Sequence, residues 1–248
     1  MSMIIDACTA QHQGCRKEQQ DQVAIVQHPK NSRVILAALA DGMGGHTGGL
    51  LAAQQVIHTA VSNIGYFSEQ EDVPISLLEN CIKEAHMLIR ASRFINEQEP
   101  HSTAVLLLLQ PAQVSWAYCG DSRFYHFRGN QLLLRSIDHS YVESLLQNGL
   151  ITVEQAMIHP ERNILTTSLG GAPAPKISSG SCEHLQENDS FLLCSDGLWA
   201  YFSDAELAAF IAASSAREAA SQLIAEALRR GRGMGDNISV AIFKLLKV

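Results

Sequence analysis

The sequence lacks any hydrophobic run long enough to cross a membrane. A spanning helix takes about 18 or more consecutive apolar residues, and the longest runs here, Val34 to Ala40 and Thr103 to Leu109, have the length of core strands. The segment from Met1 to Gln11 also lacks the basic start and the apolar stretch of a signal peptide. We therefore expect an uncleaved cytoplasmic protein that has no contact with a membrane.

Cysteines with the spacing of a metal or redox site are absent as well. None of the six cysteines belongs to a C-x-x-C pair, which argues against a zinc site or a disulfide framework. None is followed by an arginine six positions later, so the loop of the thiol-based phosphatases is missing.

Positive charge is scarce. The 248 residues include 18 Lys and Arg against 25 Asp and Glu, a net charge of −7, which argues against broad binding of nucleic acid. Hydrophobic residues make up 46% of the chain, so disorder is excluded and a core can form without disulfides. Because no linker or repeat interrupts the sequence, we expect a single domain over residues 1–248.

Several catalytic signatures are missing. There is no Gly-Lys pair of a P-loop, no G-x-S-x-G elbow and no H-E-x-x-H helix. The glycine-rich segment 41–48 follows a strand and precedes a helix, as a dinucleotide fingerprint would, but Thr47 replaces the third glycine and another helical segment comes next. A nucleotide-binding role is therefore disfavoured.

Strands and helices are gathered in separate blocks. Strand-length apolar runs cover residues 23–26, 34–40, 103–109, 114–119, 124–127, 132–134, 191–194 and 238–246, and helical periodicity covers 50–63, 74–95, 204–213 and 217–230. Turn residues at 110–112 and 129–130 predict hairpins and an antiparallel meander in the middle of the chain. This segregation predicts an α+β fold with a central antiparallel β-sandwich flanked by helix pairs on both outer faces. Residues 139–180, with their Pro and Gly, read as a surface insertion.

Four aspartates stand at the ends of apolar strands. Asp41, Asp121 and Asp196 each follow one, and Asp236 precedes the last. Aspartate is common in turns for its own reasons, but four such ends could meet at one rim of a sandwich, where each strand fixes the direction of its carboxylate.

Clustered carboxylates repel one another, and their joint ionisation requires a compensating cation. Oxygen ligands without Cys or His favour Mg²⁺ or Mn²⁺ over zinc or copper. Two such ions sharing one Asp can activate a water molecule and clamp a phosphoryl group. Near the N-terminus, Arg16 offers a planar fork for two phosphate oxygens.

Seven short blocks of the sequence resemble, in order, the motifs of the PP2C-type metal-dependent Ser/Thr protein phosphatases, especially the compact bacterial ones. The blocks are Gly14-Cys15-Arg16-Lys17-Glu18-Gln19-Gln20-Asp21, Asp41-Gly42-Met43-Gly44-Gly45-His46, Ser102-Thr103-Ala104, Gly120-Asp121-Ser122-Arg123, Ile137-Asp138-His139-Ser140, Ser195-Asp196-Gly197-Leu198-Trp199 and Asp236-Asn237-Ile238-Ser239. Each block is only moderately specific, but together they cover nearly the whole chain in the family's order.

The resemblance implies a ligand set for two Mn²⁺ or Mg²⁺ ions. Asp41 would bridge them, with the backbone carbonyl of Gly42 as a further ligand, while Asp196 and Asp236 would complete the first site. Asp21 would act on the second ion, largely through water.

It also implies roles around that centre. Asp121 with Asp196 resembles the pair that holds a third, weaker ion in bacterial members. Arg16 matches the arginine that binds phosphate, and the insertion at about 139–180 matches the variable flap beside the site.

The chain departs from the family pattern at three places. Gln19 stands where the family usually has Asn, and Gln20 stands where it often has Glu. Met43 replaces a histidine that is a candidate general acid, and His46 is a candidate substitute. His101 stands where glycine is frequent, a change for which we have no physical account.

The expected function is Mn²⁺- or Mg²⁺-dependent hydrolysis of phosphoserine and phosphothreonine in proteins by metal-activated water. A degenerate, catalytically weak relative that only binds phosphoproteins, and a phosphatase of a small phosphoester, are the alternatives. The expected partners are phosphorylated proteins, by family analogy a Ser/Thr kinase and its substrates. We expect a monomer.

Overall fold

The computed structural model describes residues 3–44, 48–96 and 99–247 and contains two antiparallel sheets. The first has the order β1-β11-β10-β7-β8 and the second the order β2-β3-β5-β6-β9, with β4 paired to β3. The strands are β1 (Met3–His12), β2 (Asp21–His28), β3 (Asn31–Met43), β4 (His101–Ser102), β5 (Ala104–Leu109), β6 (Gln113–Cys119), β7 (Arg123–Arg128), β8 (Gln131–Arg135), β9 (Ser178–Glu183), β10 (Asp189–Cys194) and β11 (Ile238–Lys247).

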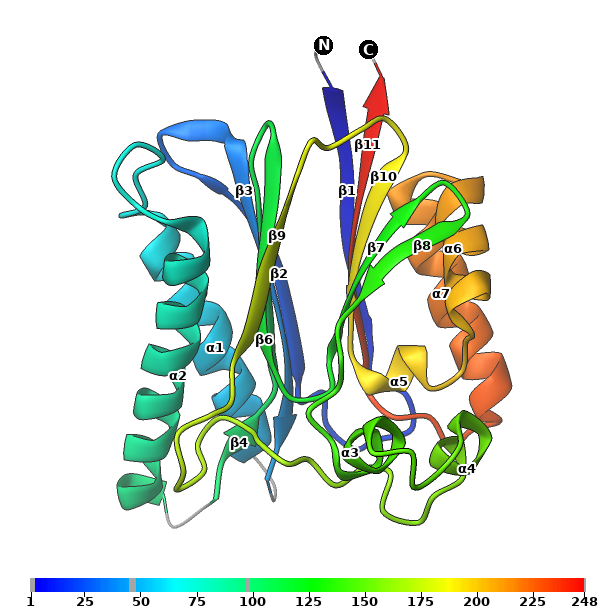
Figure 1. Ribbon diagram of the computed structural model, residues 1–248. Helices are drawn as coiled ribbons and strands as arrows, with labels where there is room; N and C mark the ends of the chain where they lie inside the picture. Colours follow the sequence, from blue (N-terminus) through cyan, green and yellow to red (C-terminus); the bar gives the residue numbers. More distant parts are fainter. Residues whose placement is uncertain (1–2, 45–47, 97–98, 248) are drawn as a thin grey trace.

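Helices cover the outer face of each sheet. In Figure 1, α1 and α2 lie along the second sheet, while α6 and α7 lie along the first. The helices are α1 (Gly48–Ile64), α2 (Pro74–Asn96), α3 (Tyr141–Gln147), α4 (Val153–Met157), α5 (Asp196–Trp199), α6 (Asp204–Ala213) and α7 (Ala216–Gly231). Within the described part of the chain, none of them combines the length and the apolar character that a bilayer span requires.

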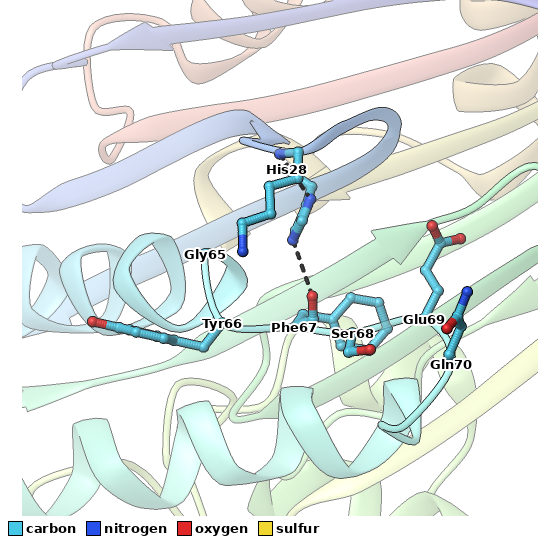
Figure 2. Close-up of a pocket in the computed structure, with 8 residues that line it drawn as sticks. His28, Gly65, Tyr66, Phe67, Ser68, Glu69 and Gln70 are labelled. Carbon is cyan, nitrogen blue, oxygen red and sulfur yellow. Dashed lines mark hydrogen bonds between the residues drawn. The ribbon is translucent and has the colours of Figure 1, made fainter.

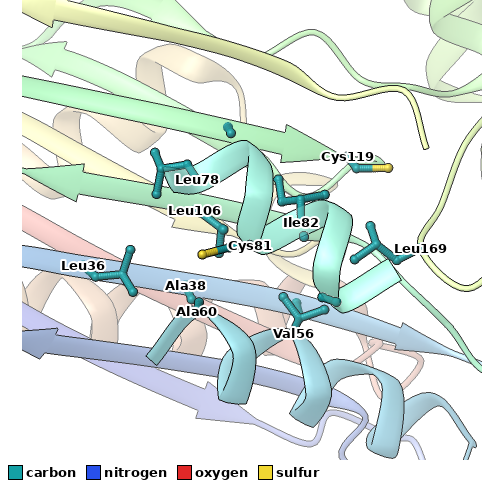
Figure 3. Packing of buried hydrophobic residues seen from close by; sticks show 14 of the residues in the cluster. Leu36, Ala38, Val56, Ala60, Leu78, Cys81, Ile82, Leu106, Cys119 and Leu169 are labelled. Atoms are coloured by element: carbon teal, nitrogen blue, oxygen red, sulfur yellow. The ribbon is translucent and has the colours of Figure 1, made fainter. Parts of the chain in front are cut away.

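The pleat of β3 shows why the layers form. Leu36, Ala38 and Ala40 belong to the core between the second sheet and its helices, whereas Ile35 and Leu39 belong to the core between the two sheets. Because successive side chains of a strand point to opposite faces, an unbroken apolar run is buried on both sides. Figure 3 shows the outer of these two cores, where side chains of α1 and α2 pack against the strands.

The predicted fold class is confirmed, since the structure has two packed antiparallel sheets with helices on both outer faces. The predicted meander is wrong at one point. β5 and β6 form a hairpin in the second sheet, and β7 and β8 form one in the first, so the chain changes sheets between Cys119 and Arg123. This crossing places Asp121 between the two sheets.

Besides the two-residue β4, the sequence prediction missed β1 and β9. β1 has few strongly apolar residues, and it pairs along its full length with β11 at the other end of the chain. β9 is small and polar, and its Gly180 lies directly against the ring of Trp116. Both are made by pairing with distant strands, which a local pattern does not report.

The strand ends that carry the predicted aspartates lie at one end of the sandwich. β2 begins there, β3 and β10 end there, and β11 begins there. The segment 136–177, which links β8 to β9 and contains α3 and α4, lies at the same end, as does α5 (Figure 1).

Truncating Leu106, a fully buried residue of β5 in the outer core, should destabilise the protein. We expect Leu106→Ala to lower the free energy of unfolding by about 2–5 kcal/mol because it removes buried methyl groups and leaves a cavity. Urea unfolding followed by circular dichroism measures this. Leu88→Ala, at a position that is 43% exposed, should cost less than about 1 kcal/mol, and equal losses for the two variants would contradict the assigned core.

Candidate active site

A pocket of about 680 Å³ lies at the strand-end side of the sandwich. Its lining includes the carboxylates of Asp41, Asp121, Asp196 and Asp236 together with the guanidinium of Arg16. The other lining residues are Cys15, Lys17, Glu18, Gln20, Gly42, Met43, Gly44, Asn163, Leu165 and Asn237. The tertiary structure thus brings together most of the residues that the sequence singled out.

Asp21 lies behind this pocket. It is the first residue of β2 and stands directly opposite Asp41 on β3. Its side chain is buried, and Ser195 Oγ donates a hydrogen bond of 2.7 Å to its Oδ2. Asp21 therefore lies next to the pocket-lining Asp41 but is not itself part of the pocket wall.

Asp41 is fixed through its backbone. Its N–H donates to Thr103 Oγ1 at 2.9 Å, and its carbonyl accepts from the Thr103 N–H at 2.9 Å. Thr103 Oγ1 is in turn hydrogen-bonded to Ser122 Oγ at 2.7 Å. Two buried hydroxyls thus connect Asp41 with the turn that carries Asp121.

Gly42 follows Asp41 where the backbone is crowded. A Cβ at this position would overlap the backbone carbonyl of Gly49 and approach that of Gln20. Only glycine fits so close to neighbouring backbone. The close packing holds the Gly42 segment at the pocket wall, where its carbonyl was predicted to be a ligand.

The loop that carries Arg16 is held by the residue after Asp236. Asn237 Nδ2 donates to the carbonyls of Gln13 and Glu18 at 2.8 and 3.0 Å, and its Oδ1 accepts from the Gln20 N–H at 2.7 Å. Arg16 Nη2 contacts Asp236 Oδ2 in an ion pair, although the Arg16 side chain remains 63% exposed. The sequence placed Asn237 only within the last motif block, and no local signal indicated this role.

Asp121 is held by the indole of α5. Trp199 Nε1 donates to the carbonyl of Asp121 at 2.9 Å. The Trp199 ring also stacks under the guanidinium of Arg123 at 3.6 Å, and Arg123 binds Asp138 through two hydrogen bonds of 2.8 and 2.7 Å. Because Trp199 and Asp196 share a short helix, the turn at Asp121 and the helix at Asp196 are tied together.

The site carboxyls resist ionisation. Burial raises the pKa of Asp21 to about 7 and that of Asp196 to about 6, and neighbouring carboxylates add to both shifts. Burial, followed by the charges of the other aspartates, also raises the pKa of Asp41 and of Asp121 well above the usual value. In Arg16, the hydrogen bond to Asp236 is the main cause of a raised pKa.

The chemistry of these donors fits a hard divalent cation. They are carboxylate and carbonyl oxygens, which Mg²⁺ and Mn²⁺ prefer, and their mutual repulsion favours added positive charge. In the ranges 3–44, 48–96 and 99–247, however, no three His, Cys, Asp or Glu side chains are gathered into a compact cage. The aspartates share a pocket, and one of them, Asp236, is paired with Arg16 instead.

The segment 136–177 contributes Asn163 and Leu165 to the pocket wall. The sequence had placed an insertion at about 139–180 beside the site without naming either residue. His46, the candidate general acid, lies outside the described residues.

A second pocket, of about 390 Å³, lies at the opposite end of β2. It is lined by His28, Lys30 and residues 65–70 (Figure 2). Both ring nitrogens of His28 are occupied, because Nε2 bonds the Phe67 carbonyl at 3.0 Å and Nδ1 accepts the N–H groups of Lys30 and Asn31. His28 therefore joins the hairpin to the segment after α1 and has no free nitrogen for catalysis.

The chain is similar to known protein phosphatases. The family model described as "Protein phosphatase 2C" matches residues 9–230. The chain is 32% identical over 213 residues to the serine/threonine protein phosphatase PstP of Mycobacterium tuberculosis, covering 84% of this chain and 40% of that protein. It is 31% identical over 216 residues to the protein phosphatase PhpP of Streptococcus pneumoniae, covering 84% of each. The chain thus spans less than half the length of PstP but most of PhpP.

A solved structure shows the same architecture. The catalytic domain of serine/threonine protein phosphatase PstP, in complex with two manganese ions, superimposes with a TM-score of 0.83 at 26% identity, over 99% of this chain and 100% of that one. The fold is therefore shared with a protein whose structure contains two Mn²⁺ ions.

Raised carboxyl pKa values give the stability of the metal-free protein a definite pH dependence. Carboxyls of the unfolded chain release their protons near pH 4, whereas Asp196 in the folded protein releases its proton at about 6. Between these values the folded state holds more protons, so the contribution of Asp196 to the free energy of unfolding falls as the pH rises.

Urea unfolding in the presence of a chelator, at several pH values, measures this contribution as the difference between wild type and Asp196→Asn. Wild type should lose roughly 1–3 kcal/mol relative to the variant between pH 4 and pH 7, at 1.36 kcal/mol for each pKa unit. Parallel stability curves for the two proteins would contradict the shift.

Proposed function

This chain belongs to the protein phosphatase 2C family, and from this premise we propose that it hydrolyses phosphoserine and phosphothreonine in proteins with the aid of Mn²⁺ or Mg²⁺. The observation that carries the proposal is the convergence of Asp41, Asp121, Asp196 and Asp236 with Arg16 on one pocket. The names of the relatives and the manganese ions in the PstP domain support it.

Asp41, the Gly42 carbonyl, Asp196 and Asp236 would hold two ions, with Asp21 acting from behind through water and Asp121 available to a third. Bound there, the metal supplies Lewis acidity that lowers the pKa of water and offsets charge on the phosphoryl oxygens. The chain's own part is to hold the carboxyl groups close together, although burial and their mutual repulsion favour the protonated form until positive charge is added.

Arg16 is suited to bind the phosphate of the substrate. Its exposed guanidinium lies in the pocket, and its contact with Asp236 uses only Nη2. A guanidinium has five N–H donors in a planar fork, so the remaining donors can face two phosphate oxygens while the pair with Asp236 fixes the group.

A thiol nucleophile is disfavoured by the environment of the buried cysteines. Burial raises the pKa of Cys81 to about 11 and that of Cys119 to about 12, so both stay protonated at neutral pH. Cys15 is exposed at the pocket, but the residue six positions after it is Asp21, where thiol-based phosphatases have arginine. Attack by water at the carboxylate cluster is the reaction that these residues support.

The partners proposed for this activity are phosphorylated proteins, with a Ser/Thr kinase and its substrates as the specific prediction. Action as a monomer in the cytoplasm likewise stays a prediction, as does the division of 1–248 into one domain with a flap at about 139–180.

Neutralising a pocket aspartate should abolish activity. We expect Asp196→Asn and Asp236→Asn to lower kcat on an aryl phosphate and on a phosphothreonine peptide by at least about 100-fold with Mn²⁺ present, because each removes a charged oxygen ligand. Asp72→Asn is the matched control and should retain activity, because Asp72 is exposed, lies between α1 and α2 and does not line the pocket.

The same assay with and without a chelator separates the alternatives. Wild-type activity that is lost in chelator and restored by Mn²⁺ supports the phosphatase. Binding of phosphopeptides without turnover would indicate a degenerate relative that only binds phosphoproteins. Turnover of small phosphoesters but not of phosphopeptides would indicate a phosphatase of a small phosphoester.

Removing the guanidinium should mainly weaken substrate binding. We expect Arg16→Ala to raise KM for the aryl phosphate by roughly 10-fold, about 1.4 kcal/mol of a charge-assisted hydrogen bond, and Arg16→Lys to restore only part of it because ammonium lacks the planar fork. Steady-state kinetics give both constants. An unchanged KM and kcat in Arg16→Ala would remove Arg16 from the site.

A further inference from the structure

Ser195 has a buried hydroxyl that none of the roles above uses. It lies between β10 and α5, directly before Asp196, and is fully buried. Its Oγ donates to Asp21 Oδ2 at 2.7 Å and accepts from the Ser239 N–H at 3.0 Å. A hydroxyl has a single proton to donate. The Asn237 carbonyl, at 3.5 Å, is therefore a weaker acceptor for this proton than Asp21 Oδ2.

This hydroxyl joins the two sheets at the site. Asp21 begins β2 of the second sheet, whereas Ser195 directly follows β10 and Ser239 belongs to β11 of the first. Gln11 of β1 strengthens the junction, because its Nε2 donates to the Asp21 carbonyl at 3.1 Å and to Ser239 Oγ at 3.0 Å. The polar groups around Asp21 are thus supplied by the opposite sheet.

We propose that Ser195 is a positioning residue for the metal centre: its hydroxyl fixes the carboxylate of Asp21 relative to Asp196 and Asp41, and so strengthens binding of the divalent ion that Asp21 serves. This inference rests on the proposed function. The Ser195 side chain reaches from the first sheet to Asp21 of the second, and its backbone leads directly into Asp196, so the carboxylates on either side of the sandwich are held in one arrangement.

The sheets themselves have other hydrogen bonds at this place. The Ser195 N–H donates to the Ser239 carbonyl at 3.1 Å, and the Gly42 N–H donates to the Gln20 carbonyl at 3.3 Å. These backbone bonds remain when the hydroxyl is removed. Loss of Oγ instead leaves Asp21 Oδ2 and the Ser239 N–H without this buried partner. The Asp21 carboxylate then keeps its side-chain hydrogen bond to Ser239 but loses one of the two hydroxyls that restrain its orientation.

The test is Mn²⁺ binding to Ser195→Ala, measured by titration calorimetry on chelator-treated protein. Loss of a partner that orients a metal-binding group typically weakens affinity by about 10–100-fold, and we expect at least about 10-fold here. Ser136→Ala is the matched control, since Ser136 is 4% exposed and its Oγ accepts the Phe124 N–H at 3.0 Å without contacting a carboxylate. Its Mn²⁺ affinity should stay within about twofold of wild type.

A double-mutant cycle with Asp21→Asn identifies the route of the effect. If Ser195 acts through Asp21, adding Ser195→Ala to Asp21→Asn should change Mn²⁺ affinity by less than about twofold. The same 10-fold loss in both backgrounds would overturn the proposal, because Ser195 would then act on Asp196 or on the fold. An unchanged affinity in the single variant would overturn it as well.

Urea unfolding in chelator shows whether each variant is folded. If Ser195→Ala does not fold, Ser195→Cys takes its place, because a thiol has a similar shape and is a weaker donor; a wild-type affinity in that variant would count against the proposal. Failure of the proposed function gives a different result: wild type would then bind no Mn²⁺ and hydrolyse no phosphopeptide, whereas failure of this inference leaves both intact.

Discussion

The carboxyl groups of the pocket are withdrawn from water and repel one another, and the fold has to hold them together against this repulsion. Asp21, Asp41, Asp121 and Asp196 all have raised pKa values because they are removed from water and lie near one another. Such a cluster would spread apart or stay protonated if the chain could relax. The site exists because the surrounding fold does not let the strands that carry these groups separate.

The sandwich supplies that rigidity by burying both faces of its sheets. β3 carries Asp41 and packs against helices on one side and against the other sheet on the other, while β10 leads to Asp196 with every residue buried. Protein interiors are close-packed, with few voids and low compressibility, so a displaced group strains its neighbours. A strand held in this way can present a carboxylate in an unfavourable place, because moving it would disturb a whole layer of the core.

The loops complete the site with charge of the other sign. Asn237 binds the backbone of the Arg16 loop at three points, and this brings the guanidinium to Asp236. Glycine at position 14 allows the approach, since its backbone has a positive φ of 63° and a Cβ there would overlap the Asp236 carbonyl. Arg16 therefore offsets part of the negative charge at the rim and stays available to an anion that enters the pocket.

Elements with strong local signals could be predicted from the sequence. Residues 204–213 form α6 with the predicted bounds, the apolar run 34–40 forms the middle of β3, and the strand-end aspartates with Arg16 do meet in one pocket. These succeed because hydrophobic periodicity reports burial directly and because a turn after a strand limits where a side chain can point.

Which distant groups meet could not be predicted and is known from the folded structure alone. β1 forms by pairing with β11, and the change of sheet at Asp121 contradicts the predicted meander. Contacts between residues more than 150 positions apart give several polar side chains their roles, namely those of Gln11, Ser195, Ser239 and Asn237. A polar side chain carries the same local signal whether it faces water or a carboxylate from another sheet. Its partner is set by packing between the sheets, which no window of sequence contains.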